Sequence, residues 1–412
     1  MHSIVFNLII VIISVNFILE RILSFLNGRI LSNKLPQELE GVYDEERYKK
    51  SQEYKHVKDK FSVITSSFSF ILIICMLFFH GFAYVDEISR DIVDNEILIT
   101  LVFFGILMFA SDILNIPFSL YATFVIEEKY GFNKTTVKTF ILDKIKGWIL
   151  AIILGGGIMA MIVWIYHKTG TMFWIYAWIV ISFFSIFMSM FYSSLIVPLF
   201  NKQTPLEDGE LRSEISSFAE RTGFKLDNIF VMDGSKRSTK ANAYFSGLGP
   251  KKRIVLFDTL INDLTTKEIV SVLAHEIGHY KLKHTLSSII LSIIQTGITL
   301  YILSLLIDNP ALSTALGAEE TGFHLGLITF GIIYSPISTI VGLFMNALSR
   351  KNEYQADAFA SKHYEGEELI NSLKKLSSNS LSNLTPHPLY VFFHYSHPTL
   401  LQRIKAIRAI ND

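Results

Sequence analysis

The stretch Val270 to His284 contains the residues whose types and spacing could do chemistry. His275, Glu276 and His279 occur there in the order His-Glu-x-x-His. Because side chains four residues apart share one face of a helix, both imidazoles can reach a single metal ion. Glu276 lies beside them, where it can take a proton from an attacking water. The pattern predicts two zinc ligands and a general base, the minimum equipment for hydrolysing a peptide bond.

A third zinc ligand is needed, and the segment Ser349 to Ala360 offers one. Glu353 and Asp357 are four residues apart in this segment, hence on one helical face. Glu353 suits the third ligand. Asp357 suits a carboxylate that accepts a hydrogen bond from the far nitrogen of a ligating histidine and so fixes its tautomer. If Glu353 is not the ligand, His284 and His363 are the alternatives.

Two further polar groups stand near the C-terminus. Ser396 precedes His397 and Pro398, an order typical of a helix start. The packed face of that helix would consist of Leu400, Leu401, Ile404 and Ile407. His397 and Arg403 are then free for the site, where a zinc hydrolase needs a donor that stabilises the developing oxyanion.

The composition is that of a membrane protein. Half of the residues are apolar, 18% are charged, and the mean hydropathy is +0.39, which no ordinary soluble domain of this length needs. The 37 basic and 37 acidic residues balance, so no net field attracts nucleic acid. The single cysteine, Cys75, excludes an intramolecular disulfide and a cysteine-built metal site.

Seven apolar runs are long enough to cross a membrane, because a helix that rises 1.5 Å per residue covers about 30 Å of hydrocarbon in some 20 residues. The first run lacks a preceding positive charge and a following cleavage site, so we expect a retained anchor rather than a signal peptide. The runs are Ile4–Leu19, Phe61–Val85, Ile97–Ile126, Trp148–Tyr166, Met172–Phe200, Leu286–Ile307 and Phe323–Leu348.

The loops between these runs alternate in positive charge. Residues 27–60 carry eight Lys or Arg and residues 127–147 carry five. Residues 86–96 and 167–170 carry one each, and residues 308–322 carry none. The positive-inside rule places the basic loops in the cytoplasm, with the N-terminus outside and the C-terminus inside. The segment with the HExxH pattern then faces the cytoplasm.

The polar segment between the fifth and sixth runs, residues 201–284, has the pattern of a small α/β unit. Leu206 to Arg221 has helical spacing. Short strands are expected at Asn228–Met232, Ala241–Phe245 and Arg253–Phe257. An exposed edge strand can hold an extended peptide by backbone hydrogen bonds, with little regard to sequence. Asn242, in the second strand, is a candidate substrate contact.

Several polar residues stand inside the apolar runs, where hydrocarbon penalises them. For Asn16, His324 and Asn346 an interhelical hydrogen bond is the simplest explanation. Asp112 indicates a hydrated interior, because a carboxylate at membrane depth needs water or a partner. Asn115, His80 and Gln295 are expected to face water with it.

Five blocks, in order, resemble the motifs of the type I CAAX prenyl proteases, which are integral-membrane zinc metalloendopeptidases of the gluzincin kind. The blocks are SKRSTKANAYFSG from Ser235, IVLFDTL from Ile254, LAHEIGH from Leu273, EYQADAF from Glu353 and HYSHP from His394. YGFNK, from Tyr130, also resembles a family motif, so the similarity runs from there to the C-terminus.

The resemblance implies an all-α membrane protein, in which seven transmembrane helices form an α-barrel around a hydrated chamber. A small α/β zinc protease domain would lie on its cytoplasmic side. His275, His279 and Glu353 would bind one Zn²⁺, and Glu276 would be the general base.

The resemblance also implies roles for four residues around the metal. Asp357 would support a ligand and Asn242 would contact the substrate, while His397 and Arg403 would support the scissile carbonyl. The expected partners are a peptide or protein substrate, prenylated or not, and the lipid bilayer.

The chain is expected to divide into four regions. Residues 1–200 would hold transmembrane helices 1–5, residues 201–284 the α/β segment, residues 285–348 transmembrane helices 6 and 7, and residues 349–412 the C-terminal cytoplasmic helices. The C-terminal sequence lacks a dilysine retrieval pattern. The membrane is therefore left open between a bacterial inner membrane and the endoplasmic reticulum or inner nuclear membrane.

Two other functions are compatible with parts of the sequence. A heat-shock-type quality-control protease shares HExxH but has fewer membrane spans and no chamber. A non-enzymatic seven-span protein could use zinc structurally, although a closed structural site would need a fourth protein ligand.

Overall fold

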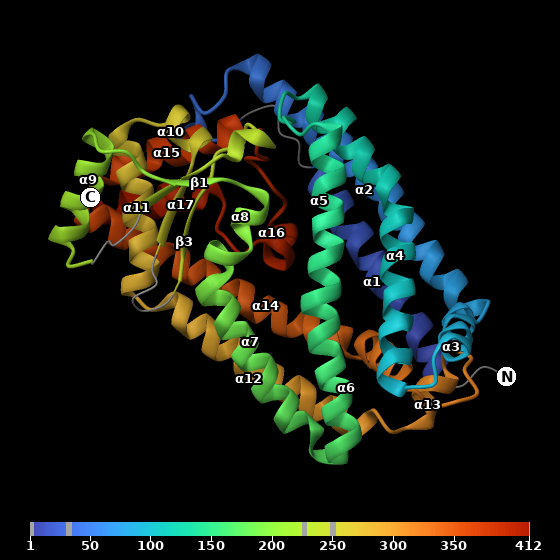
Figure 1. Cartoon of the computed structure of the whole chain (residues 1–412). Helices are drawn as coiled ribbons and strands as arrows, with labels where there is room; N and C mark the ends of the chain where they lie inside the picture. The colour runs from blue at the N-terminus through green and yellow to red at the C-terminus, as the bar shows by residue number, and fades with distance from the viewer. Residues whose placement is uncertain (1–3, 30–34, 225–228, 248–252, 412) are drawn as a thin grey trace.

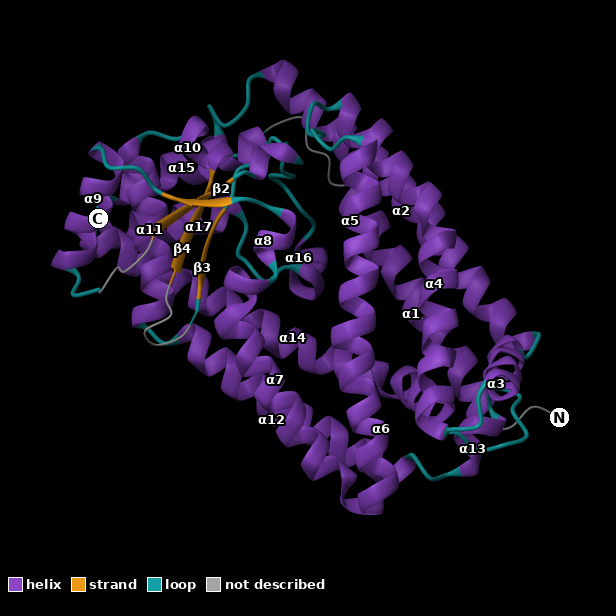
Figure 2. Ribbon diagram, viewed as in Figure 1, coloured by secondary structure: helices purple, strands orange, loops and turns teal. Residues whose placement is uncertain are grey.

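The computed structural model describes residues 4–29, 35–224, 229–247 and 253–411. In this part of the chain, one small sheet and the short helices around it gather at one end, and long helices extend away from them (Figures 1 and 2). The part of the long-helix region that precedes the sheet in the sequence consists of α1 (Ile4–Arg29), η1 (Gln37–Leu39), α2 (Glu45–Phe78), α3 (Gly81–Ile92), α4 (Glu96–Tyr121), η2 (Ala122–Glu127), α5 (Val137–Leu150), η3 (Ala151–Gly156), α6 (Gly157–Thr169), η4 (Gly170–Met172), α7 (Phe173–Leu195) and α8 (Val197–Phe200).

Three later helices complete the long-helix region, and the remaining elements surround the sheet. The three helices are α12 (His284–Leu306), α13 (Pro310–Thr314) and α14 (Phe323–His363). The elements around the sheet are β1 (Gln203–Pro205), α9 (Glu210–Arg221), β2 (Ile229–Met232), η5 (Gly234–Lys236), β3 (Ala243–Ser246), β4 (Arg253–Phe257), α10 (Asp258–Asp263), α11 (Thr266–Lys281), α15 (Gly366–Asn379), α16 (Pro388–His394) and α17 (Leu400–Asn411).

Six helical stretches among the described residues are long and apolar enough to cross a membrane. The sequence predicts seven, and the difference lies in the stretch Val137–Phe200, whose 64 residues contain a reversal at η4 (Figure 1). The second predicted run is too long at its end. Its helix stops at Phe78, because His80 adopts a left-handed conformation with φ of 54° and Gly81 opens the separate helix α3.

The sheet has the strand order β1-β2-β4-β3, with β2 and β4 parallel and both outer pairs antiparallel. The three predicted strands are present, although Asn228 lies outside the described residues. Strand β1 escapes prediction because Gln-Thr-Pro is short and ends in proline. Its hydrogen bonding continues from Leu206 N–H to the Ile229 carbonyl, which delays the predicted helix to Glu210. Strand β3 is left at one edge.

Helix α11 begins with a reciprocal cap. The Thr265 hydroxyl accepts from the Glu268 N–H, and the Glu268 carboxylate accepts from the Thr265 N–H at 2.8 Å. The capping residue, Thr265, stands one position before Thr266, the first residue of the helix. Farther along, a Cβ on Gly278 would lie 3.2 Å from Ala356 Cα, so glycine allows α11 to approach α14 closely.

Helix α14 runs for 41 residues without interruption. The sequence predicts a membrane run that ends at Leu348, whereas the helix continues to His363 and carries Glu353 and Asp357 in its last third. A membrane-type helix therefore delivers these two carboxylates directly to the region of the sheet.

Two ion pairs attach the segment before β3 to the long helices. Arg237 donates two hydrogen bonds to Asp143 of α5, at 2.8 and 2.9 Å. Lys240 pairs with Glu127 at the end of η2, at 2.8 Å, and its ammonium lies 4.3 Å from the ring centre of Phe132. The edge strand is thereby fixed relative to the membrane-type helices.

Two of the polar residues predicted at membrane depth, Asp112 and His324, have protein partners. Asp112 of α4 accepts hydrogen bonds from Lys144 Nζ at 2.6 Å and Trp148 Nε1 at 2.8 Å, both on α5. His324 is buried and bonds Asp86 through Nε2 at 2.7 Å. The carboxylate that indicates a hydrated interior is thus neutralised by a neighbouring helix.

We predict that Thr265→Ala destabilises the protein by about 0.5–2 kcal/mol, because the first turn of α11 loses a capped N–H. Thermal unfolding in detergent measures the effect, and Thr266→Ala is the matched control one residue inside the helix. Equal melting temperatures for the two variants would contradict the role of the cap.

Candidate metal centre

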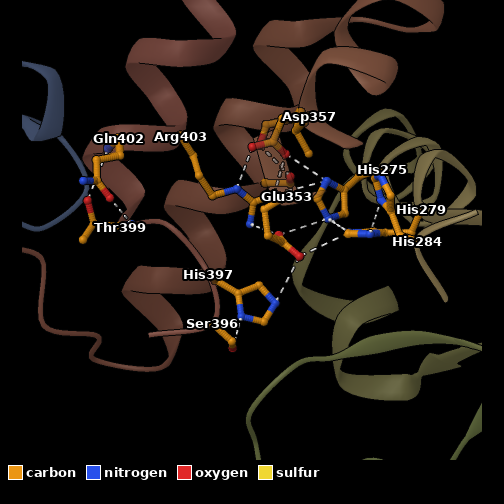
Figure 3. Close-up of polar contacts among 12 residues, drawn as sticks. His275, His279, His284, Glu353, Asp357, Ser396, His397, Thr399, Gln402 and Arg403 are labelled. Atoms are coloured by element: carbon orange, nitrogen blue, oxygen red, sulfur yellow. Dashed lines mark hydrogen bonds and ion pairs between the residues drawn. The ribbon is translucent and has the colours of Figure 1, made fainter. Parts of the chain in front are cut away.

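Helix α11 carries His275, Glu276 and His279. Figure 3 shows the two histidines beside Glu353 of α14. The Nε2 atoms of the two histidines lie 3.1 Å apart. His275 is buried, whereas His279 and Glu276 are partly exposed. The spacing of four residues therefore brings both imidazoles to one point, as the sequence predicts.

Glu353 of α14 completes a group of three donors. Its Oε1 lies 3.2 Å from His279 Nε2, and its Oε2 lies 3.4 Å from His275 Nε2. One donor atom from each residue lies within 4.8 Å of the others, the only such group of three or more His, Cys, Asp or Glu in the described part of the chain.

These three donors fit a zinc ion. Ligands bound at about 2.0–2.1 Å in a tetrahedral site are about 3.3 Å apart. The two Nε2 atoms are 3.1 Å apart, and they lie 3.2 and 3.4 Å from Oε1 and Oε2 of Glu353, respectively. These separations match that edge. Glu353 Oε2 is also buried without a hydrogen-bond partner, a cost that a bound cation would remove.

Asp357 and Arg403 lie behind the ligands. Asp357 is fully buried, and its Oδ1 accepts a hydrogen bond from His275 Nδ1 at 2.8 Å. Arg403 donates to both oxygens of the same carboxylate, at 2.6 and 2.9 Å. The Arg403 Nη1 is 3.7 Å from Glu353 Oε2. The Arg403 guanidinium is thus anchored by Asp357 and lies close to Glu353.

The charge of His275 depends on these neighbours. Burial disfavours its imidazolium form, but the hydrogen bond to Asp357 and the nearby carboxylate of Glu353 outweigh burial and raise the pKa of His275 to about 9 in the metal-free protein. A metal must displace that proton. The affinity for a metal ion therefore rises with pH up to about this value.

His397 approaches the centre from the C-terminal segment. Its Nε2 lies 3.3 Å from Glu353 Oε1, and its Nδ1 lies 3.0 Å from Ser396 Oγ. Arg350 of α14 holds this segment by donating to the Tyr395 carbonyl at 2.6 Å. The His397 side chain is 63% exposed, which leaves it accessible to a ligand.

The predicted helix start before His397 is wrong. Helix α17 begins at Leu400, because Thr399 and Gln402 form the reciprocal cap, with hydrogen bonds of 2.9 and 3.3 Å (Figure 3). Ser396 instead contacts the ring of His397. The predicted packed face is confirmed in that Ile404 and Ile407 are fully buried.

One pocket of about 290 Å³ brings most of the predicted site residues together. Asp357 is outside its lining, behind His275. The pocket is lined by Ala241, Asn242, Ala243, Leu260, Val272, His275, Glu276, His279, Glu353, Leu369, Leu373, Leu376, His397 and Arg403.

Asn242 stands at the entrance to the edge strand. Its side-chain oxygen accepts from the Ala243 N–H at 2.9 Å, and its backbone carbonyl accepts from the Phe257 N–H at 3.0 Å. The residue is therefore held by β3 and β4, on the wall of the pocket that also contains Glu276.

His284 and Gln355 lie behind His279, a position that the sequence did not predict for either residue. His284 Nδ1 lies 3.1 Å from His279 Nδ1, and His284 Nε2 lies 3.0 Å from Gln355 Oε1. His284 thus contacts the nitrogen of His279 that points away from Glu353, which is not the position of a third ligand. His363, the other alternative, is exposed and bonds a carbonyl of its own helix. The only sequence feature that could have indicated the role of His284 is its position five residues after His279.

Two family models match nearly the whole chain. A model described as CAAX prenyl protease N-terminal, five membrane helices, matches residues 28–202. A model described as peptidase family M48 matches residues 205–411. The similarity therefore begins about 100 residues earlier than the motif at Tyr130 indicates.

Individual relatives agree with the family models. The chain is 40% identical to the CAAX prenyl protease 1 homolog of Arabidopsis thaliana over 90% of each chain. It is 35% identical to CAAX prenyl protease 1 of Saccharomyces cerevisiae, over 93% of this chain and 90% of the relative. The crystal structure of S. mikatae Ste24p superimposes with a TM-score of 0.92 and 36% identity, covering 99% of this chain and 100% of that one.

We predict that His275→Ala, His279→Ala and Glu353→Ala each lose most of the bound metal, because two remaining donors hold it weakly. Asp357→Asn should keep stoichiometric metal but bind it roughly 10- to 100-fold more weakly. Metal analysis and chelator competition on the purified variants measure both. Full metal content in Glu353→Ala would assign the third ligand elsewhere.

Proposed function

The chain belongs to the CAAX prenyl proteases of peptidase family M48, and on this premise we propose that its metal is zinc, held by His275, His279 and Glu353. Family membership makes the protein a membrane metalloendopeptidase. The zinc assignment is carried by the spacing of these three donors beside Glu276 in one pocket. Membership of this family argues against the two other functions, a non-enzymatic seven-span protein and a heat-shock-type quality-control protease.

Glu276 is the general base in this proposal. A bound zinc supplies Lewis-acid polarisation of the scissile carbonyl. The Glu276 carboxylate takes a proton from the attacking water and passes it to the leaving amine. Glu276 is partly exposed in the pocket and lies beside His275 and His279 on the same helix. Its carboxylate can therefore reach both the attacking water and the leaving nitrogen.

His397 stabilises the negative charge that develops on the carbonyl oxygen. When the Ser396 hydroxyl donates to Nδ1, the proton of the neutral imidazole stays on Nε2, which faces the centre. That N–H donates to the oxyanion. Arg403, anchored by Asp357, adds positive charge nearby and holds the support of His275 in place.

The edge strand β3 binds the substrate backbone in an extended conformation. Its unpaired edge can add one strand by main-chain hydrogen bonds, and Asn242 at its start can donate its amide to a substrate carbonyl. Because this contact reads backbone rather than side chains, cleavage needs a flexible segment more than a particular sequence.

The long helices enclose a hydrated chamber, in our proposal, with seven membrane crossings. The two limbs of Val137–Phe200 count as two crossings. Within the most apolar window of each stretch only 6–17% of residues are buried, so these helices have two faces covered by lipid or water rather than by protein. Although Asp112 is paired with Lys144, both side chains remain about one quarter exposed, which favours water on the face where this ion pair lies.

The substrate class follows from the relatives. Those relatives are named for cleaving prenylated CAAX sequences, and we propose prenylated C-terminal peptides as the substrates of this chain. The basic loops 27–60 and 127–147 place the centre at the cytoplasmic face. Since the two relatives described above come from a plant and a yeast, the endoplasmic reticulum or inner nuclear membrane is favoured.

The central test replaces the base alone. Glu276→Gln should keep the metal, because all three ligands remain, and should abolish cleavage of a prenylated peptide, because nothing takes the proton from water. Metal content and turnover are measured on the same preparation. Near-normal turnover with full metal would refute the assignment of Glu276.

The second test concerns His397. Removal of an oxyanion donor should lower kcat roughly 100- to 1,000-fold in His397→Ala, with unchanged metal content and melting temperature. Ser396→Ala, which keeps the imidazole, should retain most of the activity. A His397→Ala protein that unfolds or loses its metal would make the residue structural.

The chamber is tested by labelling. In a Cys75→Ser background, single cysteines at Asn115 and Gln295 should react with small membrane-impermeant thiol reagents, whereas a cysteine at the exposed apolar Phe183 should be protected by lipid. The experiment uses the protein in lipid nanodiscs. Equal protection at all three positions would exclude a hydrated interior.

A further inference from the structure

We propose that His284 and Gln355 form a relay that fixes the tautomer of His279 and so prepares its Nε2 to bind the metal. The relay rests on the proposed zinc site. It assigns a positioning role to two residues, one on each of the membrane-type helices α12 and α14.

The chain places His284 directly behind His279. Helix α11 ends at Lys281, and Lys283 adopts a left-handed conformation with φ of 59° before α12 begins at His284. At this bend between the two helices, the His284 ring lies against the ring of His279. The residue is only 7% exposed, so its ring nitrogens depend on protein partners for their hydrogen bonds.

The side-chain oxygen of Gln355 determines which nitrogen of each histidine ring carries the proton. Gln355 Oε1 lies 3.0 Å from His284 Nε2, and an amide oxygen can only accept. His284 Nε2 therefore carries a proton, and in the neutral ring Nδ1 is the acceptor. At 3.1 Å, His279 Nδ1 must donate to it. The lone pair of His279 then lies on Nε2, the atom that faces Glu353.

The same helix supports both ligating histidines. Asp357 accepts directly from His275 Nδ1, and Gln355 acts on His279 through His284. Residues two apart point to different sides of a helix, so Gln355 is directed away from the face that Glu353 and Asp357 share. One stretch of α14 thus supplies a ligand and the orientation of the two others.

The first experiment changes the acceptor behind His279. His284→Leu should weaken metal binding roughly 10- to 100-fold. His284→Asn should restore most of it, because the Asn side-chain oxygen can occupy the position of Nδ1. Affinity is measured by chelator competition on the metal-free protein, and the absorption spectrum of the Co²⁺ form reports the ligand geometry. His363→Leu, at an exposed histidine, is the control.

The second experiment changes the far end of the relay. Gln355→Glu keeps an acceptor and should bind metal as the unchanged protein does, whereas Gln355→Leu should bind it several-fold more weakly. Gln355 is exposed, so both variants should fold with the same melting temperature in the metal-free state.

The outcomes separate the relay from the site on which it rests. If His284→Leu binds metal as tightly as His284→Asn, or if both lose it equally, the relay is wrong. If His279→Ala keeps its metal, the zinc site itself is wrong. A loss of affinity in His284→Leu, restored in His284→Asn, supports both.

Discussion

Three proposed metal ligands on two helices meet at one point, and the rest of the structure depends on this constraint. His275 and His279 stand on α11 and Glu353 on α14, so the two helices have to approach within reach of a single ion. Gly278 makes the approach possible, because a Cβ there would meet Ala356 at 3.2 Å. Since α14 is also a membrane-type helix, the catalytic centre cannot move independently of the membrane region.

Burial of charge explains why the C-terminal segment returns to the centre. A buried carboxylate such as Asp357 is costly unless its oxygens are bonded. His275 and Arg403 satisfy both oxygens, and Arg403 arrives on α17. The same segment carries His397 to the rim. The C-terminal segment and the first turn of α17 therefore complete an electrostatic arrangement that begins in the membrane-type helix.

Sequence patterns predicted what depends on short-range spacing. The pairs His275 with His279 and Glu353 with Asp357 follow from four-residue periodicity, and the strands follow from composition. The pairing of Asp112 with Lys144 and the approach of His284 to His279 depend on how helices pack, which periodicity does not encode. The predicted start of the helix that carries Arg403 is three residues too early, because Ser396-His-Pro resembles a cap, whereas Thr399 and Gln402 form the actual one.

The arrangement of strand, pocket and membrane helices limits what can be cleaved. Strand β3 is tied to the long helices through Lys240 and Glu127, so the strand that we propose to bind the substrate backbone and the membrane-type helices form one unit. A pocket of about 290 Å³ admits a single extended segment, not a folded surface. The proposed substrate class would meet both requirements, because a chain held to the bilayer by a lipid at its C-terminus has a flexible end that is already confined to the membrane surface.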